Sequence, residues 1–386
     1  MQKFSELVYT RPDIAAIADS IRAYTAALTN AKSFEETRDL FLTHSAKMSE
    51  FFTMYTIASV RNTVDTRDAF YEAEIEYLDG ESPKLDLIMR EASEALLASP
   101  FRAEMEKEFG SLYFKNMEIQ KQFADERIVD DRVQESKLCQ RYSKITANAA
   151  IEFRGEERNF YGLLKFMEST DRDTRREAFT AWAELYSRIA PELDEIFDEL
   201  VQIRHGMAQK LGFASYTEMA YLENQRYDYA EKDTARFRVQ VKEIVTPVVA
   251  KLRAQQAKNL GIDVLRYYDE ALTYPNGNPL PIGDKDELVA KAHRMYREMS
   301  AETAEFFDCM VENELFDLET RPGKRPGGYC TVLTAYQVPF IFSNFKRNSL
   351  HGDEAFRLSV DGAVFWRGMP TCNSAVRAAA SATSIF

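Results

Sequence analysis

The chain contains four histidines, and their spacing decides which metal chemistry the sequence can support. They are His44, His205, His293 and His351, and no two of them are four positions apart. A zinc site of the His-Glu-x-x-His type needs two imidazoles four residues apart on one helix face. A di-iron helix bundle instead needs a glutamate three residues before a histidine, but these positions hold Gln202 and Ala290. The sequence therefore predicts no metal ligands and no catalytic residues.

Clusters of acidic residues offer a second kind of chemistry. Asp194, Glu195, Asp198 and Glu199 place several carboxylates on one side of a predicted helix. Such a group could serve acid–base catalysis or metal binding, but in an acidic chain we interpret it as a solvated face. The run from His351 to Glu354 mixes ligand types without a partner motif, and Gly327-Gly328 lacks the spacing of a phosphate-binding loop.

Composition limits the class of protein. The 386 residues include 62 acidic and 49 basic side chains, for a net charge of -13, which argues against nucleic acid as a partner. No apolar run approaches the roughly 20 residues of a membrane helix, and the residues after Met1 lack an apolar secretion signal. Cys139, Cys309, Cys330 and Cys372 are far apart, which favours free thiols. We expect a cytoplasmic protein with no membrane partner.

The elements that would position any site are mostly helical. Apolar residues recur at three- and four-residue spacing from Pro12 to Leu28, and a second helix follows the capping box that begins at Ser33. We predict that Asp79-Gly80 ends a third helix and that Ser82-Pro83 begins a fourth. The fold class is predicted as mainly α-helical, with small β-hairpin and sheet insertions.

Later segments follow the same pattern. A hairpin is predicted from Ala149–Phe153 and Asn159–Leu163, and one helix is expected to end at Pro191 and the next at Gly212. A bend is expected at Pro247, and a single helix over Asp286–Leu315.

The segment from Phe316 to Phe345 interrupts the helical pattern. Its proline and glycine residues break the helix, and two β-prone runs follow at Tyr329–Leu333 and Val338–Phe345. We therefore predict a small sheet set into a helical protein.

The same segment carries a family resemblance. The run Arg321-Pro-Gly-Lys, then Gly327-Gly-Tyr-Cys-Thr and Pro339-Phe-Ile-Phe-Ser-Asn-Phe, resembles zinc oligopeptidases of family M3, in the oligoendopeptidase F branch. Further matching pieces occur at 171–179, 204–216 and 267–270. The likeness is best from about residue 140 to Phe345, where it stops.

The resemblance implies a function as well as a fold. It implies helical walls around a channel that admits short peptides, and zinc as the family's cofactor. It also implies that Gly328, Tyr329 and Cys330 lie on or beside a strand that could pair with substrate backbone. A purely structural sheet edge is an equally open interpretation.

The sequence departs from the family after Phe345, because no His-Glu-x-x-His occurs anywhere in it. We expect an incomplete metallo-oligopeptidase fold, without catalytic zinc or peptide hydrolysis. Its expected parts are a helical domain (1–110), a helical wall with the first part of the peptidase domain (111–345), and a non-family tail (346–386). A non-catalytic peptide-binding or scaffolding module is the alternative, and the oligomeric state stays open. The tail fits a frameshift hypothesis, because codons for Lys346 to Ser349 can be read one base along as Asn-Gly-Thr. An intact frame in the DNA would contradict it.

Overall fold

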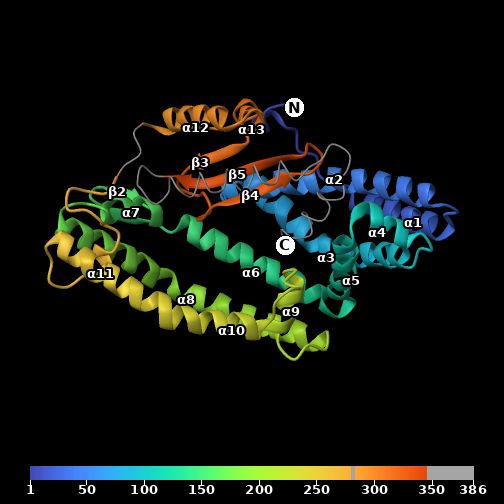
Figure 1. The fold of residues 1–386 in the computed structure, drawn as a ribbon, viewed down its shortest axis with the longest axis horizontal. Helices are drawn as coiled ribbons and strands as arrows, with labels where there is room; N and C mark the ends of the chain where they lie inside the picture. Colours follow the sequence, from blue (N-terminus) through green and yellow to red (C-terminus); the bar gives the residue numbers. More distant parts are fainter. Residues whose placement is uncertain (280–282, 346–386) are drawn as a thin grey trace.

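The computed structural model describes residues 1–279 and 283–345 (Figure 1). The predicted tail, His351 and Cys372 lie outside these residues. The first half holds helices α1 (Ile14–Asn30), α2 (Phe34–Val64), α3 (Ala69–Leu97), α4 (Arg102–Phe109), α5 (Ser111–Gln120) and α6 (Val129–Asn148). Then follow β1 (Ile151–Phe153), β2 (Glu156–Arg158), α7 (Phe160–Met167), α8 (Arg172–Lys210), α9 (Tyr216–Glu223), α10 (Glu231–Gln240) and α11 (Thr246–Leu260). The last elements are α12 (Lys285–Met299), α13 (Ala301–Glu312), β3 (Phe316–Glu319), β4 (Tyr329–Leu333) and β5 (Val338–Phe345). The predicted fold class, mainly helical with small sheets, is confirmed.

Helices α1 to α5 share one apolar core. The predicted cap at Ser33 is present, since its side chain accepts from the Glu36 N–H in the first turn of α2. Helix α1 is capped by Asp13, which was not predicted, through the Ala16 N–H. Ile21 and Leu78 are fully buried where α1 packs on α3. No helix in the described residues is long and apolar enough to cross a membrane.

The predicted break at Gly80 and Pro83 is wrong, because α3 runs through both residues. Leu78 before the proline and Leu85 after it are buried in the same core, so the helix keeps one apolar face along its length. The Asp79 carboxylate at this point accepts hydrogen bonds from Ser136 and Gln140 of α6. Burial and these contacts outweigh the hydrogen bond that proline removes.

The predicted end of a helix at Pro191 is also wrong, because α8 continues to Lys210. Leu185 and Ile196 are both buried on either side of the proline, which again favours a continuous helix. The predicted stop at Gly212 is confirmed by its left-handed φ of 87° just after the helix. Near Pro247 the chain forms a π-helical turn at Val241–Val245 between α10 and α11.

Two further boundaries differ from prediction. The hairpin is present as β1 and β2, but Asn159 caps α7 instead of extending the second strand, since its Oδ1 accepts from the Gly162 N–H at 2.8 Å. The single helix predicted over 286–315 divides at Ser300, which is extended and caps α13 through its own side chain. A Ser with non-helical backbone geometry is a strong helix-start signal.

The central sheet has strand order β3-β5-β4 (Figure 1). β4 and β5 occupy the residues predicted from sequence and pair as an antiparallel hairpin. β3 was not predicted, and it pairs in parallel with β5. Phe340 and Phe342 of β5 are almost fully buried. The sheet core also includes residues from α2, α12, α13 and the first ten residues of the chain.

The start of the chain packs against this sheet. The Phe4 N–H donates to the Asn313 carbonyl at 2.8 Å, and the Phe4 ring lies against Phe340 with centroids 4.3 Å apart. Arg61 of α2 donates to the Leu7 carbonyl at 2.6 Å. Residues from both ends of the described chain therefore build one core.

Candidate functional site

Strand β4 is an edge of the sheet, because among the described strands only β5 pairs with it. Cys330 lies opposite Ile341, and Val332 lies opposite Pro339. The Ile341 N–H donates to the Leu315 carbonyl at 3.0 Å and so points away from β4. In an antiparallel pair, Cys330 and Val332 must then direct their own N–H and C=O groups away from β5.

The three predicted substrate-binding residues therefore differ in what they present. Cys330 directs its backbone polar groups toward the outer edge. Gly328 does the same if the strand alternation extends one residue before β4. Tyr329 directs its backbone polar groups toward Phe342 of β5. It could therefore contribute to peptide binding only through its side chain and through its position in the strand.

The Tyr329 side chain fixes the start of β4. Its ring stacks on Phe342, with centroids 4.7 Å apart and planes at 6°. Its hydroxyl lies 2.6 Å from the Thr63 hydroxyl, which itself donates to the Val60 carbonyl. Tyr329 is therefore the donor in that pair. Burial raises the pKa of Tyr329, so the phenol stays neutral and anchors the strand to α2.

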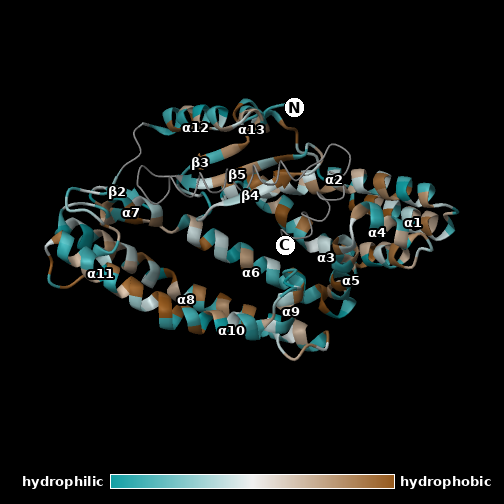
Figure 2. Cartoon of the chain, in the orientation of Figure 1, coloured by the Kyte–Doolittle hydropathy of each residue, from teal (hydrophilic) through white to brown (hydrophobic). Residues whose placement is uncertain are grey.

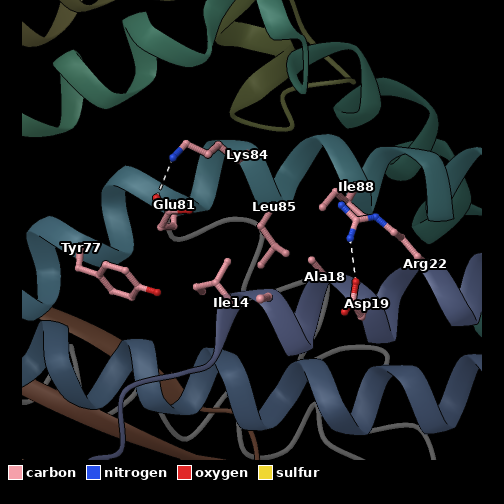
Figure 3. Close-up of a pocket in the computed structure, with 10 residues that line it drawn as sticks. Ile14, Ala18, Asp19, Arg22, Tyr77, Glu81, Lys84, Leu85 and Ile88 are labelled. Atoms are coloured by element: carbon pink, nitrogen blue, oxygen red, sulfur yellow. Dashed lines mark hydrogen bonds and ion pairs between the residues drawn. The ribbon is translucent and has the colours of Figure 1, made fainter.

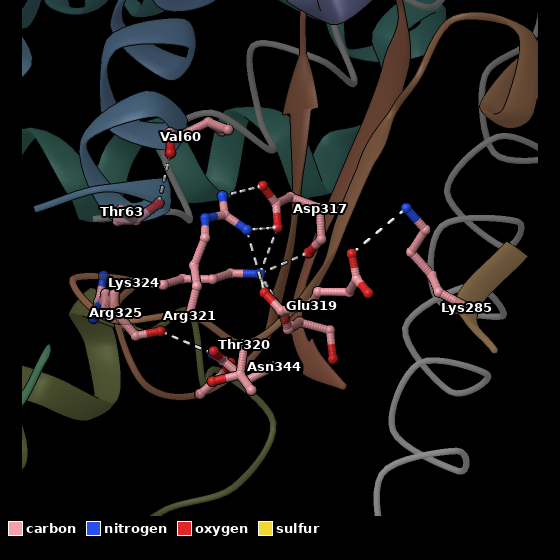
Figure 4. A network of polar contacts seen from close by, with 12 residues as sticks. Val60, Thr63, Lys285, Asp317, Glu319, Thr320, Arg321, Lys324, Arg325 and Asn344 are labelled. Carbon is pink, nitrogen blue, oxygen red and sulfur yellow. Dashed lines mark hydrogen bonds and ion pairs between the residues drawn. The ribbon is translucent and has the colours of Figure 1, made fainter. Parts of the chain in front are cut away.

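A buried lysine anchors the loop that precedes β4. The Lys324 side chain is fully buried, and its ammonium donates to the Asp317 carboxylate at 2.6 Å and to the Glu319 carbonyl at 2.8 Å (Figure 4). It also donates to the Ser343 carbonyl and lies 4.5 Å from the Phe342 ring centroid. One ammonium thus ties the loop to β3 and β5.

The charge of Lys324 is balanced by its surroundings. Burial lowers the pKa of Lys324 to about 8, although Asp317 acts in the opposite direction. Burial by itself would raise the pKa of Asp317, but Arg321 and Lys324 outweigh it and keep that pKa below its usual value. Arg321 holds both Asp317 oxygens, one at 2.9 Å and the other at 2.5 Å. The three side chains form a compact ionic cluster.

Backbone contacts position the rest of the loop. The Gly323 carbonyl accepts from both the N–H and the hydroxyl of Thr66 at 2.8 Å. Gly323 has φ of 80°, a backbone conformation that favours glycine, and a Cβ there would also have to displace the Arg67 side chain. The Gly327 N–H donates to the Tyr161 hydroxyl, and Asn344 of β5 donates to the Gly327 carbonyl. The edge strand is therefore held from α2, α7 and β5.

The described histidines lie apart and have other contacts. His44 stacks on Tyr24 at 4.0 Å, and burial lowers its pKa to about 4. His205 contacts Gln209 of its own helix at 3.0 Å, and His293 contacts Asp308 of α13. Within residues 1–279 and 283–345 no three His, Cys, Asp or Glu residues lie close enough to hold a metal ion. These donors do not fit a catalytic zinc.

The acidic cluster on α8 matches the interpretation as a solvated face. Asp194, Glu195 and Asp198 are exposed, and Glu195 makes a surface ion pair with Arg141 at 2.8 Å. A separate groove of about 410 Å³ lies between α1 and α3 (Figure 3). Its floor includes Ala18 and Leu85, far in sequence from the strand edge, and the charged residues at its rim pair with each other.

Comparisons with known proteins identify the family. Residues 4–124 match the peptidase M3 N-terminal domain, and residues 165–275 match peptidase family M3. PZ peptidase A, solved with an inhibitor, is 36% identical with a TM-score of 0.93, over 99% of this chain and 69% of that one. The chain belongs to peptidase family M3. The resemblance noted in the sequence is thereby confirmed.

Two other solved members of family M3 are similarly close. A protein from Bacillus anthracis assigned as an oligoendopeptidase F is 36% identical with a TM-score of 0.91, over 94% of this chain and 67% of that one. A second protein so assigned is 38% identical with a TM-score of 0.92, over 95% and 65%. The chain thus spans about two thirds of the length of these relatives. No curated protein sequence matches it.

The residues that position the edge have no recognisable signature in the sequence. Lys324 and Arg321 belong to the segment that carried the family resemblance, but nothing in their spacing indicates a buried ion pair with Asp317. The signal that could have found them is an arginine and a lysine on either side of Gly323, in a segment whose neighbours are strongly apolar. Charged residues in such surroundings need a partner.

Proposed function

We propose that these residues form the peptide-holding part of a zinc-dependent oligopeptidase that acts on short peptides. The outer edge of β4 is the observation that carries the proposal. An extended peptide can add to an exposed sheet edge through main-chain hydrogen bonds, independently of its side chains. Family membership supports peptides as the substrate class.

The contacts around β4 support a rigid binding edge. The strand and its loop are connected to other elements through Tyr329, Lys324 and Gly323. The binding edge is therefore already ordered before a peptide binds. Pre-organisation of this kind raises affinity because less conformational entropy is lost on binding. Within the proposal, Gly328 and Val332 offer outward backbone groups, Cys330 lies between them on the strand, and Tyr329 sets the position of the strand.

We expect no peptide hydrolysis by these 386 residues alone. The printed sequence contains no His-Glu-x-x-His, and the described donors do not fit zinc. We therefore expect peptide binding without cleavage, which is also what the alternative, a non-catalytic peptide-binding module, would give. The acidic composition and dispersed cysteines support a cytoplasmic location as a further part of this proposal.

Substitution of Val332 by proline tests the edge. The Val332 N–H points away from β5, so proline removes an outward donor and no hydrogen bond of the ladder. Binding of a fluorescent oligopeptide, measured by anisotropy, should weaken by about tenfold in Val332→Pro. Val332→Ala is the matched control, because it shortens the side chain and keeps the N–H.

Two outcomes would contradict the proposal. Equal affinity of Val332→Pro and Val332→Ala, with both variants folded by circular dichroism, would show that peptide does not pair with this edge. Cleavage of the peptide with stoichiometric zinc bound to the purified 386 residues would refute the expected lack of hydrolysis.

A further inference from the structure

Arg325, in the loop before β4, carries a positive charge that its surroundings do not neutralise. The residue is exposed, and its guanidinium makes no hydrogen bond or ion pair within residues 1–279 and 283–345 (Figure 4). The other two cations of this loop differ, because Arg321 and Lys324 both pair with Asp317. An arginine in this state can present its planar fork of N–H donors to a carboxylate ligand.

The backbone of Arg325 is held from two elements. Its N–H donates to the Thr63 carbonyl of α2 at 2.9 Å, and its carbonyl accepts from the Asn344 side chain of β5 at 2.8 Å. These contacts fix the Cα of Arg325 relative to the sheet and do not involve the guanidinium. The side chain therefore starts from a fixed point and stays available for a ligand.

Electrostatics places the Arg325 side chain toward α6. Burial raises the pKa of the Cys139 thiol on α6, and the positive charges of Arg204 and Arg325 oppose that rise, which requires both to lie near the thiol. Arg204 pairs with Glu135 at 2.6 Å, so of these two cations only Arg325 lacks a partner in the described chain. In Figure 1, α6 lies beyond β4 on the side opposite β5. Helix α6 is largely hydrophilic, which suits a charged ligand (Figure 2).

The outer edge of β4 begins close to this charge. Gly327 uses both of its backbone groups, since its N–H donates to a hydroxyl of α7 and its carbonyl accepts from β5. The edge that a peptide can use therefore starts at Gly328, three residues after Arg325. Three extended residues span at most about 10 Å, and the chain bends at 326–327, which shortens that distance. A peptide paired with β4 thus has one end within reach of the guanidinium.

We propose that Arg325 binds a carboxylate of the peptide that pairs with β4, either its carboxyl terminus or an acidic side chain next to that terminus. The proposal rests on the proposed peptide binding at the outer edge of β4. Main-chain pairing is independent of peptide sequence, so Arg325 adds a preference that the edge alone does not give. Two parallel hydrogen bonds to the carboxylate also set the direction in which the peptide lies.

Three forms of one short peptide of neutral residues, labelled with dansyl at the amino terminus, test the proposal. The first has a free carboxyl terminus, the second a carboxyl-terminal amide, and the third a glutamate followed by the amide. Affinity for the 386-residue protein is measured by anisotropy. We expect the first or the third form to bind about tenfold more tightly than the neutral amide. A gain in the first form assigns the terminal carboxylate, and a gain in the third assigns the acidic side chain.

Arg325→Gln should abolish this difference and leave the affinity for the neutral amide unchanged, because the backbone contacts to Thr63 and Asn344 remain. Arg294→Gln is the matched control. It removes the same charge from α12, where the Arg294 side chain is 82% exposed and pairs with Glu298 of its own helix. This control should keep the tenfold difference.

The results separate the role of Arg325 from that of the edge. Equal affinity for all three peptides, together with weaker binding of each by Val332→Pro, would overturn the proposal and leave the edge intact. A difference that persists in Arg325→Gln, or that disappears in Arg294→Gln as well, would also overturn it. Binding that Val332→Pro does not change, or no binding of any form, would contradict the proposed function and the role of Arg325 with it.

Discussion

Replacement of Lys324 by methionine should destabilise the protein in a way that depends on pH. Methionine keeps most of the volume of the buried side chain but removes the ammonium. Asp317 would retain Arg321, while the carbonyls of Glu319 and Ser343 would lose a donor. Removing one partner of a buried pair costs about 3–5 kcal/mol, and the remaining arginine places the expected loss near the lower value, about 3 kcal/mol at pH 7.

The pH dependence follows from the lowered pKa of Lys324. Its value in the folded protein is about 8, whereas an unfolded lysine titrates at its ordinary value of 10.5. Between these values the unfolded state binds more protons, so wild-type stability should rise with pH from about 8 to about 10.5. The ionised amine is the less favourable form in the folded state, and its loss relieves that cost. Lys324→Met should lack this rise.

Urea unfolding followed by circular dichroism measures both effects. Lys285→Met is the matched control, since Lys285 pairs with Glu319 at 3.6 Å but is partly exposed (Figure 4). Its loss should cost less than about 1 kcal/mol. A change in Lys324→Met no larger than in the control, or an unaltered rise above pH 8, would refute the reasoning.

Three further substitutions test other features. Asp269 is fully buried against Arg172 and Arg175. Burial opposes the ionisation of Asp269, but the two arginines hold its pKa below the usual value. The stabilising effect of the ionised carboxylate is therefore present at neutral pH and lost on acidification. Asp269→Asn should lower the unfolding free energy by about 3 kcal/mol at pH 7 and flatten the acid limb of a stability curve. His44 has a lowered pKa of about 4, so the folded state resists protonation, and stability should fall as pH drops from about 6.5 to about 4. His44→Phe should remove about 2 kcal/mol of that fall, measured by urea unfolding. Pro83→Ala should raise the unfolding free energy by about 2 kcal/mol by restoring a hydrogen bond within α3; a lower melting temperature would contradict this.

Local patterns predicted the parts of the fold that local forces determine. The strands at 329–333 and 338–345 were predicted to the residue, because alternating β-prone residues lie between turn-forming ones. β3 was missed, since Phe316-Asp-Leu-Glu is short and half acidic and becomes a strand only by pairing with β5. Parallel pairing between distant segments leaves little trace in the sequence of either one.

The errors at Gly80, Pro83 and Pro191 have the opposite origin. Each residue weakens a helix locally, but buried leucine and isoleucine residues on both sides keep the helix in one piece. Tertiary burial is worth several times the local penalty when it extends over many turns. For the candidate site, the family resemblance indicated the strand, whereas the direction of its backbone groups required the register with β5. The domain boundaries at 110 and 345 remain predictions.

The contact of the first residues with the sheet has a consequence for biosynthesis. Lys3 pairs with Glu314 across 311 positions, and Phe4 shares a core with Phe340. While the chain emerges from the ribosome, helices α1 to α5 can bury their common core early, but the strands that Phe4 contacts do not yet exist. The first residues of the chain therefore stay exposed and unpaired until nearly all of the described chain has been synthesised. Closing so long a loop favours late and slow completion of the sheet.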